Sequence, residues 1–177
     1  MRAVQIIRLI SFFIAFAFLT SCASRGSITD GARVKSSAGL VAFKVTTNLS
    51  HAQLQYKKFL AQETRESMTR EYFLGPDEAV VIKPGEKYWL MSVEPGDYMW
   101  SKVFAYTREA SFHSSNRFTV EAGKITYVGH IEVIADQDMA RIIVKDDEAD
   151  MVRYIQSHYP IYYSNMKMEK SVTEFRR

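Results

Sequence analysis

The side chains able to carry out chemistry in this chain are few and scattered. Its 177 residues include one cysteine and four histidines, at Cys22, His51, His113, His130 and His158. They are not spaced as zinc ligands are, and the sequence contains no His-Glu-x-x-His. We therefore expect ordinary surface or half-buried histidines, no metal site and no cofactor. Spacing alone leaves open whether two histidines meet in the fold.

Signatures of nucleophilic catalysis are also missing. There is no Gly-x-Ser-x-Gly turn, and the neighbouring His113 and Ser114 do not make a catalytic triad, which is defined by geometry. We expect no catalytic residues and hence no enzyme. The least favoured alternative is a hydrolase whose site is assembled from His113 or His130 and distant acidic residues.

Two pairs of acidic residues have simpler explanations than calcium binding. Asp136 and Asp138 lie in a short polar stretch, and Asp146 and Asp147 precede a helical pattern. Neither pair has the glycine and the spaced carboxylates of an EF-hand loop. We expect a turn at the first pair and helix capping at the second.

The N-terminus carries the most specific pattern in the sequence. Arg2 and Arg8 flank a basic opening, and Leu9 to Leu19 is apolar except for one serine. About eleven residues are too few to cross a bilayer as a helix, which takes about 20, but they suit a secretory signal. The run ends in Leu19-Thr20-Ser21-Cys22, which resembles the lipobox of bacterial lipoprotein signal peptides.

This resemblance implies that Cys22 is acylated. In lipoproteins of this kind the signal peptide, here residues 1–21, is removed and the new N-terminal cysteine receives acyl chains. Two or more chains hold a protein firmly on a bilayer, whereas one chain binds only marginally. Ala23 stands where an aspartate would indicate inner-membrane retention, so we expect the periplasmic face of the outer membrane, with the inner membrane as the alternative. An uncleaved N-terminal membrane helix is the competing interpretation.

Charge and composition narrow the range of partners. Removal of residues 1–21 leaves 21 basic and 20 acidic residues, so the pI of 8.9 for the whole sequence overstates the basicity of the mature protein. A nucleic-acid partner calls for a strongly cationic face and is not expected. Once Cys22 is acylated, no thiol remains for a disulfide, and stability must come from one buried core.

After a short polar stretch, the pattern of residues in the remaining chain changes to one typical of strands and turns. Residues 22–37 are the acylated cysteine and a predicted flexible tether with a root-mean-square span of roughly 20 Å. From Gly39 onward, short β-branched and aromatic runs alternate with turn residues. Pro84-Gly85 and Pro95-Gly96 each predict a reversal of the chain. Between them, Tyr88 to Val93 is apolar on both faces, which favours a central strand.

One helix is predicted near the C-terminus, over Glu148 to Tyr159. Met151, Ile155 and Tyr159 lie one turn apart on one face, and Pro160 should stop the helix. About nine short strands with one late helix indicate an antiparallel β-sandwich, a mainly β fold class. We therefore divide the chain into a signal peptide (1–21), the acylated cysteine with its tether (22–37), the β-sandwich with its helix (38–160) and a tail (161–177).

Two motifs support this fold class by resemblance. Val93 to Tyr98 reads Val-x-Pro-Gly-x-Tyr, and Phe118 to Gly129 reads Phe-Thr-Val-x-Ala-Gly-Lys-x-Thr-Tyr-Val-Gly. Together they resemble small uncharacterised proteobacterial lipoproteins with a transthyretin-like (prealbumin-like) β-sandwich. The resemblance covers about Leu40 to Pro160 and implies a fold, but it brings no catalytic residues.

Aromatic residues supply the one candidate binding face. Tyr98, Trp100 and Lys102 alternate along a predicted strand and should share a face, and the lysine indicates that this face reaches solvent. Exposed rings there could stack on sugars or anchor a protein. The alternative is that Tyr98 and Trp100 fill the core, as we expect for Trp89.

The expected function is therefore binding without catalysis. We expect a lipid-anchored periplasmic module, held in the bilayer by acylated Cys22, that binds or scaffolds another envelope component, with a protein as the favoured partner. A peptidoglycan- or glycan-binding module that uses Tyr98 and Trp100 is the alternative.

Overall fold

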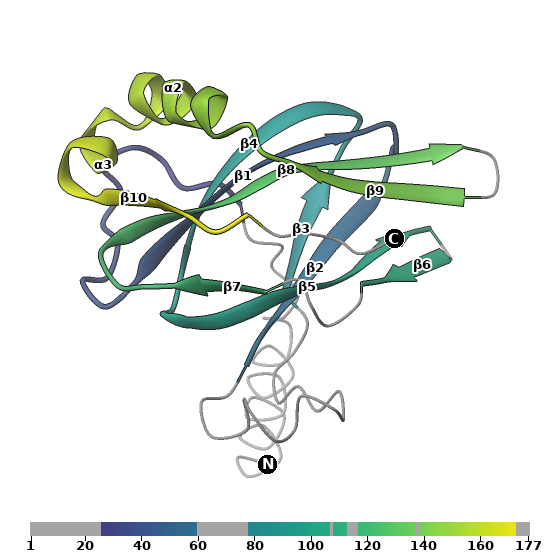
Figure 1. Cartoon of the computed structure of the whole chain (residues 1–177), viewed down its shortest axis with the longest axis horizontal. Coiled ribbons are helices and arrows are strands. Elements are labelled where there is room, and N and C mark those ends of the chain that lie inside the picture. Colours follow the sequence, from purple (N-terminus) through teal and green to yellow (C-terminus); the bar gives the residue numbers. More distant parts are fainter. Residues whose placement is uncertain (1–25, 60–77, 107, 113–116, 137–138, 173–177) are drawn as a thin grey trace, which may run out of the picture.

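The computed structural model describes residues 26–59, 78–106, 108–112, 117–136 and 139–172. Within these ranges the chain forms two β-sheets packed face to face, and two helices lie on the outer side of one sheet (Figure 1). The expected fold class, a mainly β sandwich with helix near the C-terminus, is confirmed. The signal peptide, the lipobox and Cys22 lie outside the described residues.

The first sheet has five strands of mixed direction. They are β1 (Gly39–Thr47), β4 (Gly85–Val93), β8 (Lys124–Asp136), β9 (Met139–Lys145) and β10 (Lys167–Lys170). The central strand β8 pairs with β1 on one side and with β10 and then β9 on the other, and β4 forms the edge beyond β1. Both β1 and β10 run parallel to β8, so this sheet is not purely antiparallel.

The second sheet is antiparallel throughout. Its strands are β2 (Ala52–Lys58), β3 (Glu78–Ile82), β5 (Gly96–Ala105), β6 (Arg108–Ser111) and β7 (Arg117–Val120). The strands β2 and β5 are central, β3 lies at the edge beyond β2, and β7 and β6 follow one another along the other side of β5. The inner faces of the two sheets enclose the main hydrophobic core.

The two Pro-Gly turns carry the chain from one sheet to the other. At Pro84-Gly85 the chain passes from β3 to β4, and at Pro95-Gly96 it returns from β4 to β5. Both glycines have positive φ, +102° and +145°, which residues with a Cβ rarely adopt. Among the described strands β4 pairs only with β1, so the strand between the turns is an edge strand and the expectation of a central strand is wrong. Its outer face is apolar because a helix covers it, with Leu90 packed against that helix.

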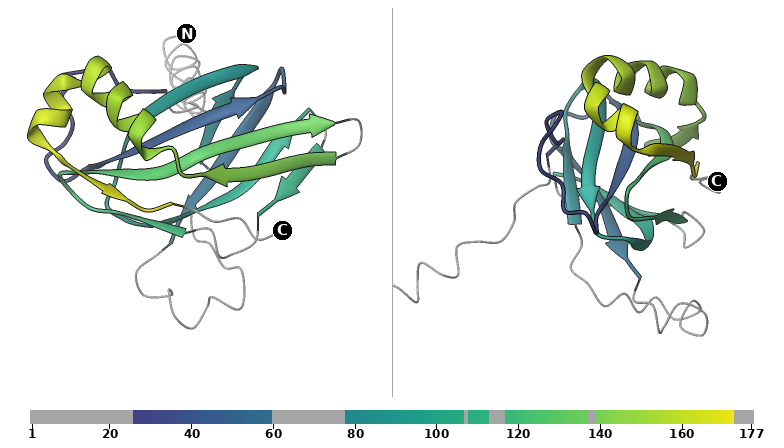
Figure 2. Two further views of the ribbon diagram at one scale, coloured as in Figure 1. Left: turned by 45° about the horizontal axis from the view of Figure 1, so that its top comes forward. Right: turned by 90° about the vertical axis from the view of Figure 1, so that its left-hand side faces the viewer.

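Two helices cover one end of the outer face of the first sheet (Figure 2). They are α2 (Glu148–His158) and α3 (Pro160–Asn165). The expected burial of Met151, Ile155 and Tyr159 is confirmed, and α2 ends one residue before the predicted boundary. Pro160 ends α2 but also begins α3, because proline suits the first turn of a helix. The segment expected to be a tail thus contributes α3 and β10 to the domain.

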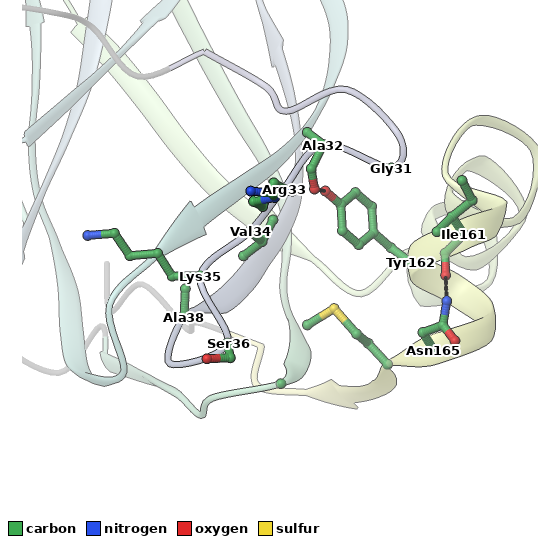
Figure 3. Close-up of a pocket in the computed structure, with 12 residues that line it drawn as sticks. Gly31, Ala32, Arg33, Val34, Lys35, Ser36, Ala38, Ile161, Tyr162 and Asn165 are labelled. Carbon is green, nitrogen blue, oxygen red and sulfur yellow. Dashed lines mark hydrogen bonds between the residues drawn. The ribbon is translucent and has the colours of Figure 1, made fainter.

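The N-terminal segment lies against the domain from Ser27 onward. The Ile28 N–H donates a hydrogen bond to the Leu90 carbonyl oxygen at 2.8 Å, and the Ser27 and Tyr159 hydroxyls are 2.9 Å apart. Further along, the Tyr162 hydroxyl donates to the Ala32 carbonyl oxygen (Figure 3). The described part of the expected tether is therefore in contact with the domain, which leaves residues 23–26 between Cys22 and the first of these contacts.

Candidate functional site

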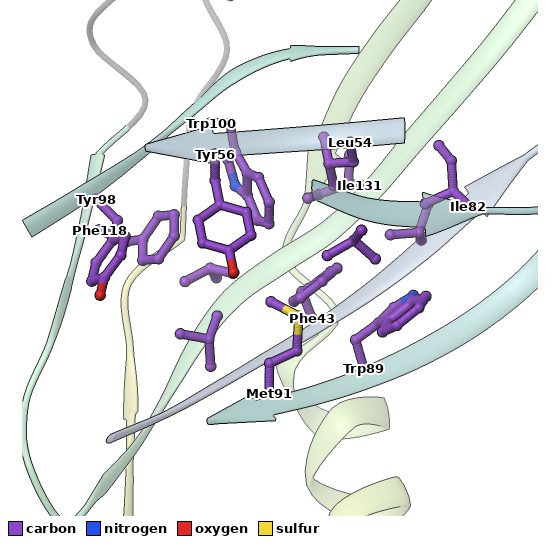
Figure 4. Packing of buried hydrophobic residues seen from close by; sticks show 14 of the residues in the cluster. Phe43, Leu54, Tyr56, Ile82, Trp89, Met91, Tyr98, Trp100, Phe118 and Ile131 are labelled. Atoms are coloured by element: carbon purple, nitrogen blue, oxygen red, sulfur yellow. The ribbon is translucent and has the colours of Figure 1, made fainter. Parts of the chain in front are cut away.

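The aromatic face expected on β5 is buried between the sheets. Trp100 has no exposed surface, and its ring lies 5.2 Å from that of Phe43 in the opposite sheet and 5.9 Å from that of Tyr56 (Figure 4). Tyr98 is buried beside it and stacks on Phe118 at 5.7 Å. The expectation that Tyr98 and Trp100 form an exposed binding face is wrong.

A β-bulge in β5 explains why the alternation of side chains predicted the wrong face for Trp100. Gln55 pairs with Lys102 and Tyr56 with Trp100, so Ser101 is an extra residue in β5. Beyond Ser101 the alternation is reversed, and Val103 joins the core while Lys102 turns outward and forms an ion pair at 3.1 Å with Glu109. The outward position of Lys102 therefore does not indicate the face on which Trp100 lies.

A second bulge builds a polar site on the outer face of the first sheet. Ala42 pairs with Tyr127 and Lys44 with His130, so two steps along β1 correspond to three along β8. The extra residue lies at Gly129, whose φ of +102° and close contacts suit a residue without a side chain. The shift turns His130 to the outer face, beside Lys44 and the start of α2.

Lys44 is the centre of this polar site. Only 7% of its surface is exposed, and its Nζ lies 2.9 Å from Asp150 Oδ2, 3.1 Å from Glu86 Oε2 and 3.4 Å from Asp147 Oδ2. The Tyr88 hydroxyl donates to Asp150 at 2.5 Å. A buried cation is costly unless carboxylates surround it, and these three come from β4, from the residue before α2 and from the first turn of α2. The contacts fasten the start of α2 to the sheet.

The same contacts fix the protonation states of the group. Burial alone would lower the pKa of Lys44, but its hydrogen bonds to Asp150 and Glu86 outweigh burial and raise the pKa well above its usual range. The hydrogen bonds from Lys44 and Tyr88 lower the pKa of Asp150 to about 2. Burial, and then the bond to Asp150, raises the pKa of Tyr88. At neutral pH Lys44 is a cation, so it is not available as a base or a nucleophile.

His130 is held beside this network by Thr46. Its Nε2 lies 2.8 Å from Thr46 Oγ1, and its Nδ1 lies 3.7 Å from Asp147 Oδ2, which is too long for a hydrogen bond. Burial and then the charge of Lys44 lower the pKa of His130, so its ring is neutral at neutral pH. Carboxylate, imidazole and hydroxyl do meet here, but Asp147 is paired with Lys44 and does not orient the ring.

The acidic pairs and the other histidines have separate surroundings. Asp147 is the N-cap residue of α2, as expected, but its carboxylate points to Lys44 and makes no capping hydrogen bond. Asp146 instead accepts a hydrogen bond from the Glu148 N–H and pairs with Lys170. The ring of His158 stacks on that of Tyr154 at 4.2 Å.

The rest of the predicted site residues can be placed briefly. The ring of His51 lies 6.0 Å from that of Tyr106, and both His113 and Asp138 fall outside the described residues. Among the residues that the structure describes, no three His, Cys, Asp or Glu side chains are grouped as metal ligands. Neither α2, α3 nor any other helix in these ranges has the length and apolar character that a bilayer-spanning helix needs.

Within the residues that the structure describes, α2 and α3 leave the other end of this sheet face uncovered. The β8–β9 hairpin extends past α2 (Figures 1 and 2), and its pairs Glu132–Ile143 and Ile134–Arg141 share the outer face with Lys44 and His130. Ile134 has 38% of its surface exposed. We call these four residues, Glu132, Ile134, Arg141 and Ile143, the hairpin patch.

Comparison with known proteins adds no assignment: the sequence matches no protein-family model, and no curated protein is significantly similar to it.

Proposed function

We propose that this protein is a lipid-anchored binding module of the bacterial envelope, which engages another envelope component, a protein in the favoured case, without catalysis. The proposed anchor is acylated Cys22, and the proposed location is the periplasmic face of the outer membrane. The anchor rests on the lipobox Leu19-Thr20-Ser21-Cys22. The observation that supports binding is the hairpin patch, a part of a sheet face that α2 and α3 leave uncovered in the described part of the chain.

The chemistry of the hairpin patch suits a protein partner. Ile134 and the half-buried Ile143 lie on diagonally related positions and provide an apolar centre. Glu132 and Arg141 flank them with opposite charges, and Glu132 pairs with Lys145 at 2.6 Å. An apolar centre with charges around it is the usual arrangement of a protein interface, where the charges select the partner and its orientation.

Two other functions have weaker support. Glycan binding was expected to use Tyr98 and Trp100, whose rings are buried, so that proposal loses its binding face. A hydrolase built around His130 would need a carboxylate that orients the ring and access for a substrate, but Asp147 is engaged with Lys44 at 3.7 Å from the ring and His130 is buried. The polar site is better explained as the attachment of α2 to the sheet, which also shapes one border of the hairpin patch.

The test is photo-crosslinking of the lipoprotein in intact cells. A photoreactive amino acid at position 134 is expected to trap one discrete protein, identified by mass spectrometry. The control position is 104, because Phe104 is also apolar, lies on a strand (β5 of the second sheet) and has 37% of its surface exposed, which matches the 38% of Ile134. The same adduct at both positions, or none at position 134, would contradict the proposed surface.

Two further measurements separate the remaining alternatives. Cys22→Ala should prevent acylation and abolish the adduct at position 134 if membrane attachment brings the partners together. Pelleting with purified peptidoglycan addresses the glycan alternative. Retention on peptidoglycan together with no protein adduct would replace the favoured function by glycan binding.

A further inference from the structure

The contacts of Ser27 shorten the link between the proposed lipid anchor and the domain. Five peptide units separate Cys22 from Ser27, and a fully extended chain spans about 3.3–3.6 Å per residue, so the link reaches at most roughly 18 Å. The free tether expected from residues 22–37 would allow any orientation of the domain. Because Ser27 lies next to Tyr159, the start of α3 must stay close to the lipid surface once Cys22 is acylated.

The surface at this place is both apolar and basic. On α3, Ile161 has 52% of its surface exposed and Tyr163 is also exposed. Arg33 and Lys35 are exposed on the adjacent N-terminal segment. A shallow pocket of about 350 Å³ lies between the two segments and is lined mainly by apolar atoms (Figure 3). Residues 31–36 together with α3 are called the basal surface below.

Contacts within the basal surface hold its two segments together. The side chain of Tyr162 turns inward to donate to the Ala32 carbonyl oxygen, so its neighbours Ile161 and Tyr163 are left on the outside. The carboxylate of Asp30 accepts a hydrogen bond from the Ile161 N–H at 3.4 Å. The acidic residue of this segment is therefore turned toward the helix, while the basic side chains are exposed.

We propose that the basal surface is the face that the domain turns toward an anionic phospholipid bilayer. Ile161 and Tyr163 would enter the region between head groups and acyl chains, and Arg33 and Lys35 would lie among the phosphates. A tyrosine suits this boundary because its ring is apolar and its hydroxyl is polar. Basic residues near an anionic membrane surface add attraction that salt weakens. The inference rests on the proposed acylation of Cys22 and adds an orientation to it.

This orientation has a consequence for partner binding. The hairpin patch lies at the opposite end of the same sheet from α3 (Figure 1). A domain that rests on its basal surface therefore presents the hairpin patch away from the membrane, where a periplasmic partner can reach it.

The test uses the full mature lipoprotein, purified from membranes and reconstituted into vesicles of phosphatidylethanolamine and phosphatidylglycerol that contain a diazirine phospholipid. After illumination, lipid adducts are mapped by mass spectrometry. Adducts are expected within residues 31–36 and 160–165, and none are expected on Phe104 and Tyr106, which are exposed on the second sheet. Adducts on the second sheet, or spread evenly over the domain, would overturn the proposal, as would protection of the basal surface by a co-purified protein.

Charge reversal gives a second measurement with a matched control. Lys35→Glu is expected to lower the yield of adducts at residues 160–165 several-fold in low salt, whereas Lys83→Glu, at an exposed position between β3 and β4, should leave it unchanged. Equal yields for the two variants would contradict the proposal.

Failure of the anchor can be recognised separately. The mass of the N-terminal peptide reports the acyl chains, so an unacylated Cys22 would contradict the proposed function, whereas an acylated protein with adducts elsewhere would contradict only the orientation.

Discussion

Lys44 and His130 are direct partners across the parallel pair of β1 and β8 because Gly129 adds one residue to β8. If Gly129 were paired in the regular way, opposite Lys44, the alternation along β8 would turn His130 into the space between the sheets, where Val128 and Ile131 lie. One glycine thus decides whether an imidazole joins the hydrophobic core or the polar site around Lys44.

Substitution of Gly129 should be costly. A Cβ at this position would lie 2.6 Å from Val144 Cγ1, and the φ of +102° adds backbone strain. We expect Gly129→Ala to lower the free energy of unfolding by about 2–4 kcal/mol, measured by chemical denaturation. Gly123→Ala is the matched control, since Gly123 has a φ of +72° but a Cβ there would meet no atom within 4 Å, and it should cost only about 1 kcal/mol. Equal losses would argue against steric exclusion at Gly129.

The ion pair between Lys44 and Asp150 should be strongly coupled. Removal of Lys44 leaves carboxylates facing a buried position, so we expect Lys44→Met to destabilise the domain by about 3 kcal/mol. A double-mutant cycle with Asp150→Asn should give a coupling of about 1–3 kcal/mol. The exposed pair Lys58–Glu94, 3.0 Å apart, is the control and should give less than about 1 kcal/mol. A coupling at Lys44 no larger than the control would show that the network does not fasten α2.

Stability should fall in mild acid because of His130. Its pKa is lowered in the folded state, so the unfolded chain, with a pKa of about 6.5, binds the proton first. The contribution of neutral His130 to the free energy of unfolding is therefore complete above about pH 6.5. It is lost as the pH falls through the pKa that His130 has in the folded state. The charged or polar groups that face the ring are Lys44, Thr46, Glu86, Glu132, Lys145 and Asp147.

Denaturation between pH 8 and pH 5 measures this effect. The dependence of the free energy of unfolding on pH should be weaker in His130→Gln than in the wild type. A further loss is expected below about pH 4, because the pKa of Asp150 is lowered to about 2 and its contribution disappears as pH approaches that value. An unchanged slope in His130→Gln would contradict the assignment to His130.

The fluorescence of both tryptophans should indicate an apolar environment from which water is excluded. Trp89 and Trp100 are buried between the sheets, so we expect blue-shifted fluorescence with little quenching by acrylamide. Trp100→Ala should cost about 3–5 kcal/mol, as large-to-small changes of buried aromatic rings do. Strong quenching of the wild-type protein would restore the exposed aromatic face and with it the glycan-binding alternative.

The sequence alone was sufficient for features that depend on neighbouring residues. The helix at Glu148–His158 follows from its apolar spacing and the proline after it, and the strands follow from β-branched runs between turn residues. The two Pro-Gly turns follow in the same way, because proline fixes its own φ and glycine, which has no Cβ, adopts the positive φ that the turn needs. The lipobox is also a local pattern, and the acylation of Cys22 stays a prediction.

The tertiary structure alone decided which side chains share a face and which strands are neighbours. Bulges at Ser101 and Gly129 depend on pairing with β2 and β1, and each reverses the alternation from which a face is predicted. The turn at Pro84-Gly85 looks the same in sequence whether the next strand joins the same sheet or the opposite one. The core position of Trp100 and the outer position of His130 could therefore not be predicted from the sequence. A one-residue shift in register arises from contacts between segments far apart in the chain.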